Sequence, residues 1–157
     1  DELPHEVFGT AMAGNVLPWI DSAVEDGQSR EEWKSMVETN LLIGKDQQIP
    51  IDGTCVRVDS LRCHSQAVTI KLKNDIPLGE LEAIISGSTE WAELVPNTQE
   101  DSIQKLTPVS VSASLNVRVG RVRKMKLGPE YLNAFVVGDQ LLWGAAEPLR
   151  RMVHILR

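Results

Sequence analysis

Residues 51–65 read IDGTCVRVDSLRCHS, and this stretch carries two ionisable side chains, Arg57 and His64. Valines alternate with other residues over residues 54–60, which is the period of a β-strand and places Arg57 on the face opposite the valines. A second strand is predicted at residues 66–72, with His64 in the connection before it. Because His64 lies in the connection between the two strands, we expect His64 and Arg57 to reach one end of a shared sheet. A strand does not need an arginine and a histidine for its stability, so this pair is a candidate for chemistry.

Arg57 and His64 together suit proton transfer on an acidic substrate. A histidine exchanges a proton near neutral pH, and an arginine holds a carboxylate by two parallel hydrogen bonds. The structural alternative is that a histidine after a strand is incidental to function. A Cys63–His64 nucleophile pair is disfavoured because adjacent side chains point in different directions, and a metal site built from Cys55, Cys63 and His64 lacks a fourth ligand. No metal is therefore expected.

A helix is predicted to begin after Ser29. Ser29 and Glu32 have the spacing of a capping box, apolar residues then recur at helical spacing, and Gly44 ends the helix. Glu31 and Lys34 lie three residues apart and are neighbours on one face of this helix. By itself, such a pair is typical of a solvent-exposed ion pair.

The rest of the chain shows interleaved helix and strand patterns. A last helix with Asp139 as N-cap and an apolar stripe facing the core is predicted from Gly138. Because helices and strands interleave and some connections have hairpin length, we expect an α/β fold of the α+β type, with a mixed, largely antiparallel sheet and helices on one face. The intervening patterns indicate a helix at 76–86, a short strand at 91–95, a loop at 96–104, and strands at 109–115, 116–123 and 133–137.

Composition excludes several classes of protein. With 157 residues, 42% of them hydrophobic and 24% charged, the chain has the composition of one globular domain. A net charge of −6 argues against nucleic-acid binding. No apolar run approaches the ~20 residues of a membrane span, and residues 1–10 do not look like a signal peptide. Two cysteines without a disulfide pattern fit the reducing cytoplasm, which we expect as the location.

The stretch 51–65 resembles the signature of the bacterial aspartate-semialdehyde dehydrogenase family. That signature has an aliphatic residue, an aspartate, Cys-x-Arg, and then a small residue, His and Ser, and every position is met here. Three blocks are similar to the long form of the enzyme found in Gram-negative bacteria: GQSREEWKSMVETN (27–40), RCHSQAVTIKLK (62–73) and GDQLLWGAAEPLRRM (138–152). Three blocks in the order of the family make a chance match improbable.

The resemblance implies a reaction and a role for particular residues. The reaction is the NADPH-dependent reductive dephosphorylation of aspartyl β-phosphate to aspartate β-semialdehyde, at the branch point toward lysine, threonine, methionine and diaminopimelate. His64 matches the acid–base catalyst and Arg57 the arginine that holds the substrate carboxylate. Glu31 and Lys34 match the acidic and basic pair at the substrate and phosphate site. Gln140 matches a glutamine that contacts the cofactor.

The resemblance also implies parts that precede this region in the family. These are the nucleophilic cysteine and the glycine-rich domain that binds most of the NADP, so residues 1–157 would be a C-terminal substrate-binding and dimerisation domain, incomplete at its N-terminus. Its fold would be like the C-terminal domain of glyceraldehyde-3-phosphate dehydrogenase, with a homodimer across the sheet. We expect the isolated chain to be inactive. The alternatives are a non-catalytic dimerisation or binding module and a degenerate paralogue, which should have lost Arg57 or His64.

Overall fold

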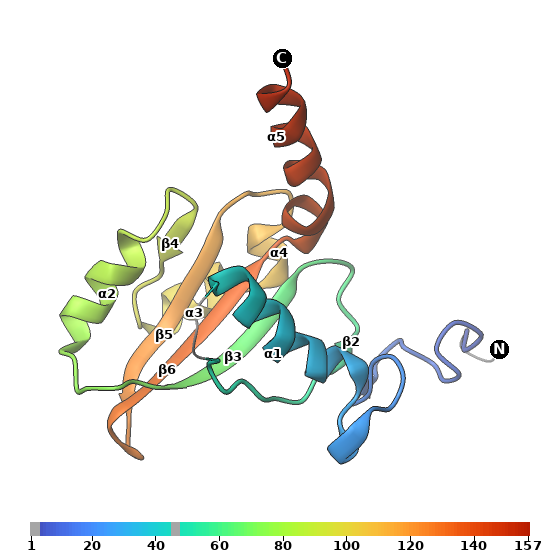
Figure 1. Ribbon diagram of the computed structural model, residues 1–157, viewed down its shortest axis with the longest axis horizontal. Coiled ribbons are helices and arrows are strands. Elements are labelled where there is room, and N and C mark those ends of the chain that lie inside the picture. The colour runs from blue at the N-terminus through green and yellow to red at the C-terminus, as the bar shows by residue number, and fades with distance from the viewer. Residues whose placement is uncertain (1–3, 45–47) are drawn as a thin grey trace. The chain divides into compact units, whose positions relative to one another are not determined.

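The computed structural model describes residues 4–44 and 48–157 of the chain. These residues divide into two compact units, which we call the N-terminal unit (Asp1–Asp59) and the C-terminal unit (Ser60–Arg157). Figure 1 shows their elements in chain order.

The N-terminal unit is built around one helix, α1 (Arg30–Ile43). The helix begins where the sequence predicts, and the Glu32 carboxylate accepts the backbone N–H of Ser29 at 2.7 Å. It ends at Gly44, whose φ of 61° is the left-handed conformation that glycine adopts without strain. The other elements of this unit are β1 (Val16–Leu17), η1 (Glu25–Gly27) and β2 (Arg57–Val58).

The strand predicted at residues 54–60 is mostly irregular. Only β2 is extended and paired, and its partner is β1, in an antiparallel two-stranded sheet. Pro18 follows β1 and lacks an N–H for a longer ladder. Val56 and Val58 are 44% and 48% exposed, so the alternation does not mark a buried face. The prediction that this strand shares a sheet with the next one is therefore wrong.

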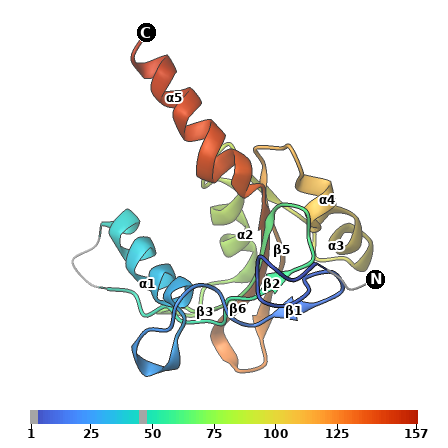
Figure 2. The same ribbon diagram turned by 90° about the vertical axis from the view of Figure 1, so that its right-hand side faces the viewer.

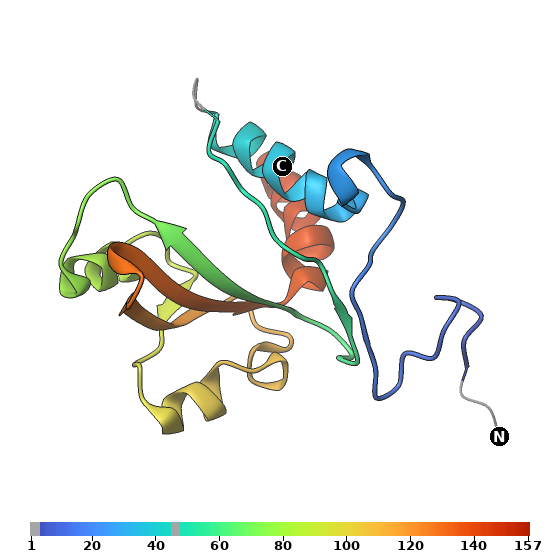
Figure 3. The same ribbon diagram turned by 90° about the horizontal axis from the view of Figure 1, so that it is seen from below.

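The C-terminal unit contains a four-stranded sheet in the order β3-β6-β5-β4. Its strands are β3 (His64–Lys71), β4 (Ala92–Leu94), β5 (Val117–Met125) and β6 (Gly128–Gly138). The β3–β6 and β5–β6 pairs are antiparallel and β4–β5 is parallel, which confirms a mixed, largely antiparallel sheet. Figure 3 shows β3 running beside the long β5–β6 hairpin. His64 is the first residue of β3 and lies opposite Gly138.

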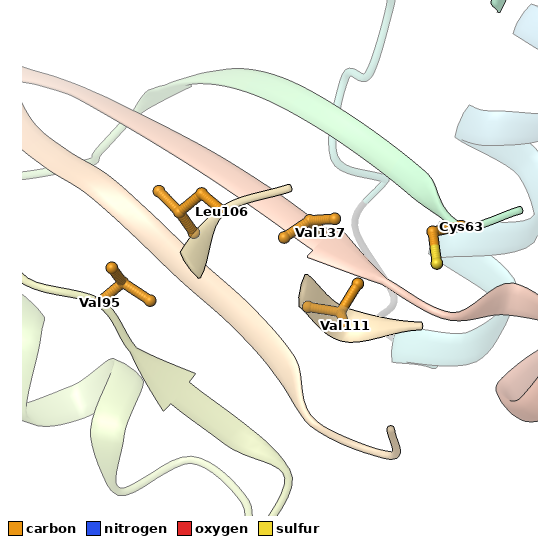
Figure 4. Packing of buried hydrophobic residues seen from close by; sticks show 5 residues of the cluster. All are labelled: Cys63, Val95, Leu106, Val111 and Val137. Carbon is orange, nitrogen blue, oxygen red and sulfur yellow. The ribbon is translucent and has the colours of Figure 1, made fainter. Parts of the chain in front are cut away.

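Helices cover both faces of this sheet. Leu132 and Ala134 of β6 pack with Leu81 of α2 (Leu78–Ser86). Val137 packs with Val111 of α4 (Pro108–Val111), in a cluster that also holds Cys63, Val95 and Leu106 (Figure 4). Leu132 and Ala134 have even numbers and Val137 has an odd number, and odd- and even-numbered residues of one strand point to opposite faces of a sheet. The helices α2 and α4 therefore lie on opposite sides of the sheet, as Figure 2 shows. The prediction of helices on one face is wrong.

Two short helices replace elements predicted otherwise. The predicted loop at 96–104 contains most of α3 (Gln99–Lys105), and the predicted strand at 109–115 begins inside α4. Thr98 caps α3 by accepting a backbone N–H from its first turn. Thr107 does the same for α4, and Pro108 occupies its first turn. Side-chain caps on short helices outweighed the alternation of serine and apolar residues.

The last helix starts as the sequence predicts but does not bury its apolar stripe. After β6, the chain forms the π-helical segment η2 (Leu142–Ala146) and then α5 (Glu147–Ile155), which projects away from the sheet (Figure 1). Leu149, Met152 and Leu156 are 66%, 58% and 81% exposed, so the predicted buried stripe is wrong. No helix within the described ranges is long and apolar enough to cross a membrane.

Candidate functional site

An ion pair of the N-terminal unit lies near the start of α1. The Nζ of Lys34 lies 3.1 Å from Oε2 of Glu31 and 4.0 Å from Oε1 of Glu38. The hydrogen bond to Glu31 is the main cause that raises the pKa of Lys34. Both side chains are partly exposed, so the ammonium group is held by the pair and remains accessible from solvent. A compact cation of this kind makes a point contact with phosphate.

Arg57 lies on β2 with its guanidinium over an aromatic ring. Its Cζ is 4.6 Å from the centroid of the Phe8 ring, a cation–π distance. Within residues 4–44 and 48–157, Arg57 forms no ion pair. Among the described residues, the guanidinium also donates no side-chain hydrogen bond. Arg57 therefore has N–H donors left, and a guanidinium can hold a carboxylate by two parallel hydrogen bonds.

Glu32 connects the first turn of α1 to the segment before Arg57. Its Oε1 accepts the backbone N–H of Cys55 at 2.9 Å, while its Oε2 accepts that of Ser29. Both hydrogen bonds lower the pKa of Glu32, and the bond from Ser29 has the larger effect. The connection ties the helix that carries Lys34 to the strand that carries Arg57.

The C-terminal unit holds a pocket of ≈ 200 Å³ at one end of its sheet. The position of the pocket follows from the register of β3 and β6. His64 lies opposite Gly138, and Gln140 follows Gly138 by two residues. The structure thus brings together His64 and Gln140, two predicted site residues that are far apart in the sequence. The lining includes His64, Gln66, Val136, Asp139, Gln140 and Trp143.

Gln140 lines this pocket and carries a side-chain oxygen that lacks a hydrogen-bond partner among the described residues. This oxygen, Oε1, is buried. A buried acceptor without a donor costs free energy. Trp143, another lining residue, donates its Nε1–H to the carbonyl of Leu115 at 2.9 Å, which fixes its ring.

Asp139 anchors the same end of the sheet from a fully buried position. Its Oδ2 accepts from Nη2 of Arg62 at 2.5 Å and from the N–H of Ala113 at 2.7 Å, and its Oδ1 accepts from the N–H of Leu141 at 3.1 Å. Burial acts to raise the pKa of Asp139, but the bonds from Ala113 and Arg62 outweigh it, so the pKa is lowered. Sequence reasoning identified Asp139 as a helix cap only and missed Arg62. The sequence did contain a signal for this ion pair. Arg62 lies two positions before His64, and Asp139 lies directly before Gln140.

Neither cysteine is suited to be a nucleophile. Cys63 is buried in the core, with its Sγ 3.4 Å from the carbonyl oxygen of Pro108. Burial raises the pKa of the Cys63 thiol, and burial followed by the charge of Glu32 raises that of Cys55. A raised pKa lowers the thiolate fraction, which is the reactive form. Within the part of the chain that the structure describes, no cluster of three metal-binding side chains occurs.

The five predicted site residues form two groups. Glu31, Lys34 and Arg57 belong to the N-terminal unit, and His64 and Gln140 to the C-terminal unit. Arg57 and His64 were expected at one end of a shared sheet, but they lie in different sheets. The first group offers cationic contacts for carboxylate and phosphate, and the second offers a proton-transfer group beside an amide acceptor.

The chain is similar to known proteins in sequence and in structure. The sequence model of a family described as "Semialdehyde dehydrogenase, dimerisation domain" matches residues 1–143. The solved aspartate semialdehyde dehydrogenase from Francisella tularensis is 43% identical to this chain, with a TM-score of 0.93. The match covers 98% of this chain and 42% of that one.

Solved structures of a more distant enzyme have the same fold. Aspartate semialdehyde dehydrogenase II from Vibrio cholerae is 27% identical, with a TM-score of 0.83, and the match covers 95% of this chain and 43% of that one. That enzyme has also been solved in complex with ASA, and the match has the same identity and TM-score. The chain thus spans about two-fifths of the length of these relatives.

Proposed function

Because the chain belongs to the semialdehyde dehydrogenase family, we propose that it is the substrate-binding and dimerisation domain, residues 1–157, of an aspartate-semialdehyde dehydrogenase. The reaction is the reductive dephosphorylation of aspartyl β-phosphate to aspartate β-semialdehyde, in the cytoplasmic biosynthesis of lysine, threonine, methionine and diaminopimelate. The observation that carries this proposal is the pocket that His64 and Gln140 both line.

The N-terminal unit binds the two acidic ends of the substrate. Arg57 holds the carboxylate through two parallel hydrogen bonds, supported by its contact with Phe8. Lys34 contacts the phosphate, and Glu31 orients the ammonium group by its 3.1 Å bond. These contacts bind ground state and transition state alike, so their loss acts mainly on KM.

His64 exchanges the proton of the reaction. Its imidazole is exposed at the start of β3 and opens into the pocket, so it can reach a substrate from one side. Once the thioacyl group has been reduced by hydride and the aldehyde has left, the nucleophilic cysteine would remain as a thiolate. The proton returned to that sulfur would come from the histidine, which exchanges a proton near neutral pH. Residues that transfer protons in the transition state act mainly on kcat.

Gln140 fits the carboxamide of a nicotinamide ring. Its side-chain amide lines the pocket, and two amide groups can exchange N–H···O hydrogen bonds. NADPH, when bound, supplies the hydride. Gln140 and the fixed ring of Trp143 would orient the nicotinamide end of that cofactor and exclude water from it.

The remaining parts of the enzyme lie outside these 157 residues. The raised pKa of Cys55 and of Cys63 supports a nucleophile supplied from elsewhere in the longer protein, together with most of the NADP site. The isolated chain would therefore have no turnover. The family description as a dimerisation domain supports a homodimer.

Activity of the full-length protein tests this proposal. With aspartate semialdehyde, phosphate and NADP, the full-length protein should form NADPH at 340 nm as the reaction runs in reverse, and the isolated chain should not. A full-length protein without this activity would refute the enzymatic proposal. If it still dimerised, the result would favour a non-catalytic dimerisation module.

A further inference from the structure

We propose that the ion pair between Arg62 and Asp139 is a positioning device that holds His64 and Gln140 together in their pocket. Both residues are positioning residues, because they act through the two pocket side chains. The inference rests on the proposed function for its kinetic readouts, but its geometric readout is independent of that function.

The ion pair joins the two strand ends that carry the pocket residues. Arg62 lies two positions before His64 at the start of β3, and Asp139 directly precedes Gln140 at the end of β6. His64 lies opposite Gly138, which places the ion pair just beyond the last rung of the ladder. Its 2.5 Å bond therefore closes the end of the β3–β6 pair where the pocket lies.

Asp139 holds three segments at once. Besides Arg62, its carboxylate accepts the N–H of Ala113 after α4 and the N–H of Leu141 at the start of the last helix. The bond from Leu141 fixes the turn on which Gln140 lies. Because the carboxylate is fully buried, its bonds are not exchanged for bonds to water.

The backbone at Cys63 separates the roles of three successive side chains. Cys63 has a φ of 79°, a left-handed conformation that is uncommon for residues other than glycine. Its thiol is buried in the core, Arg62 before it reaches Asp139, and His64 after it lines the pocket. A strained conformation persists only where surrounding contacts hold it. The ion pair supplies such a contact on the side of Arg62.

Within the described residues, the His64 imidazole forms no hydrogen bond or ion pair, so its position depends on the backbone at the start of β3. The Oε1 of Gln140 also lacks a hydrogen-bond partner among the described residues. A catalytic group whose support shifts by about 1 Å loses on the order of 100-fold in rate.

Asp139→Asn in the full-length enzyme tests the positioning role. The change keeps the shape of the side chain but removes its charge. We expect kcat to fall about tenfold or more through His64 and KM for NADP to rise about tenfold through Gln140. KM for aspartate semialdehyde should stay within about twofold, because Arg57 in the other unit holds its carboxylate.

Arg62→Lys is a second test of the ion pair, and Glu93→Gln is its control. Arg62→Lys keeps the charge but loses the planar guanidinium, so kcat and KM for NADP should change less than in Asp139→Asn. Arg62→Lys also replaces Asp139→Asn as the test if that variant does not fold. Glu93→Gln is the matched control, because it removes the 2.9 Å ion pair with Arg118 elsewhere on the same sheet. It should leave all three constants within about twofold. Equal changes in all three constants, or none, in the Arg62 and Asp139 variants would overturn the proposal.

Side-chain NMR of the same proteins separates this inference from the proposed function. An inactive wild-type enzyme would refute the proposed function. The spectra would still show whether the ion pair positions the His64 ring and the Gln140 amide. Asp139→Asn and Arg62→Lys should shift the His64 ring and Gln140 amide resonances, and Glu93→Gln should not. Unshifted His64 and Gln140 resonances in both variants would overturn the positioning role whatever the activity.

Discussion

The two units of the chain are stabilised in different ways. In the C-terminal unit, two clusters of buried apolar side chains pack against opposite faces of the sheet. Among the described residues of the N-terminal unit, the buried side chains are those of Ser29 and Glu32, both polar. Trp33 and Leu41 of its helix are 44% and 79% exposed.

This contrast shows two ways of placing functional side chains. In the C-terminal unit, sheet register and a packed core determine where His64 and Gln140 lie. In the N-terminal unit, a capping carboxylate and a cation–π contact determine where Lys34 and Arg57 lie. Under the proposed function, the unit with the core carries the proton transfer, and the unit with few buried contacts carries substrate binding.

The largest expected effect is that of His64→Ala on the full-length enzyme. Loss of the acid–base group should lower kcat by about 10²- to 10⁴-fold, because proton transfer contributes that much in typical enzymes. Steady-state kinetics with aspartate semialdehyde would measure it. His154→Ala is the matched control, since His154 is exposed on α5, and it should leave kcat within about twofold. An unchanged kcat in His64→Ala would remove the acid–base role.

The counterpart in the N-terminal unit is Arg57→Ala, which should act on KM instead. A charge-assisted contact with a carboxylate contributes about 1.5–3 kcal/mol, so KM for aspartate semialdehyde should rise about 10- to 100-fold. The same kinetic assay separates KM from kcat, which should change little. Arg57→Lys, which keeps the charge without the bidentate geometry, should lie between Arg57→Ala and wild type. A fall in kcat with unchanged KM would contradict the division between the units.

Shortening one valine side chain in each unit would show how tightly that unit is packed. Val137→Ala removes two methyl groups from a fully buried site and should lower the free energy of unfolding by about 2 kcal/mol. Val7→Ala is the same change at a site that is 82% exposed, and it should cost less than about 0.5 kcal/mol. Urea unfolding of the full-length protein would measure both. Equal losses would contradict the contrast in burial.

The smallest expected effect concerns Glu147 in the C-terminal unit. Hydrogen bonds from Arg150 and then Arg151 lower the pKa of Glu147 from its usual 4.5 to about 2. Since the folded pKa is depressed, the stabilisation is complete above about pH 4.5 and is lost as pH falls toward 2. The melting temperature should therefore fall less steeply from pH 5 to pH 3 in Glu147→Gln than in wild type. In Glu80→Gln, which changes an exposed carboxylate, the slope should match wild type.

Local signals in the sequence were sufficient for several elements. The capping pattern at Ser29 and the glycine at position 44 predicted α1 within one residue. Alternating residues predicted β3, β5 and part of β6, and the motif around His64 indicated the family. Caps, turns and periodicity depend on residues close together in the chain, so a single sequence contains them.

Contacts between distant segments were decided only by the tertiary structure. The pairing of β2 with β1 depends on which strand edge is available, and the alternation of residues 54–60 does not contain that information. The pocket shared by His64 and Gln140 exists because the β3–β6 register brings residues far apart in the sequence to one end of the sheet. The bond between Arg62 and Asp139 forms at that same end. Side-chain chemistry is local, but burial and strand pairing decide which of these side chains meet.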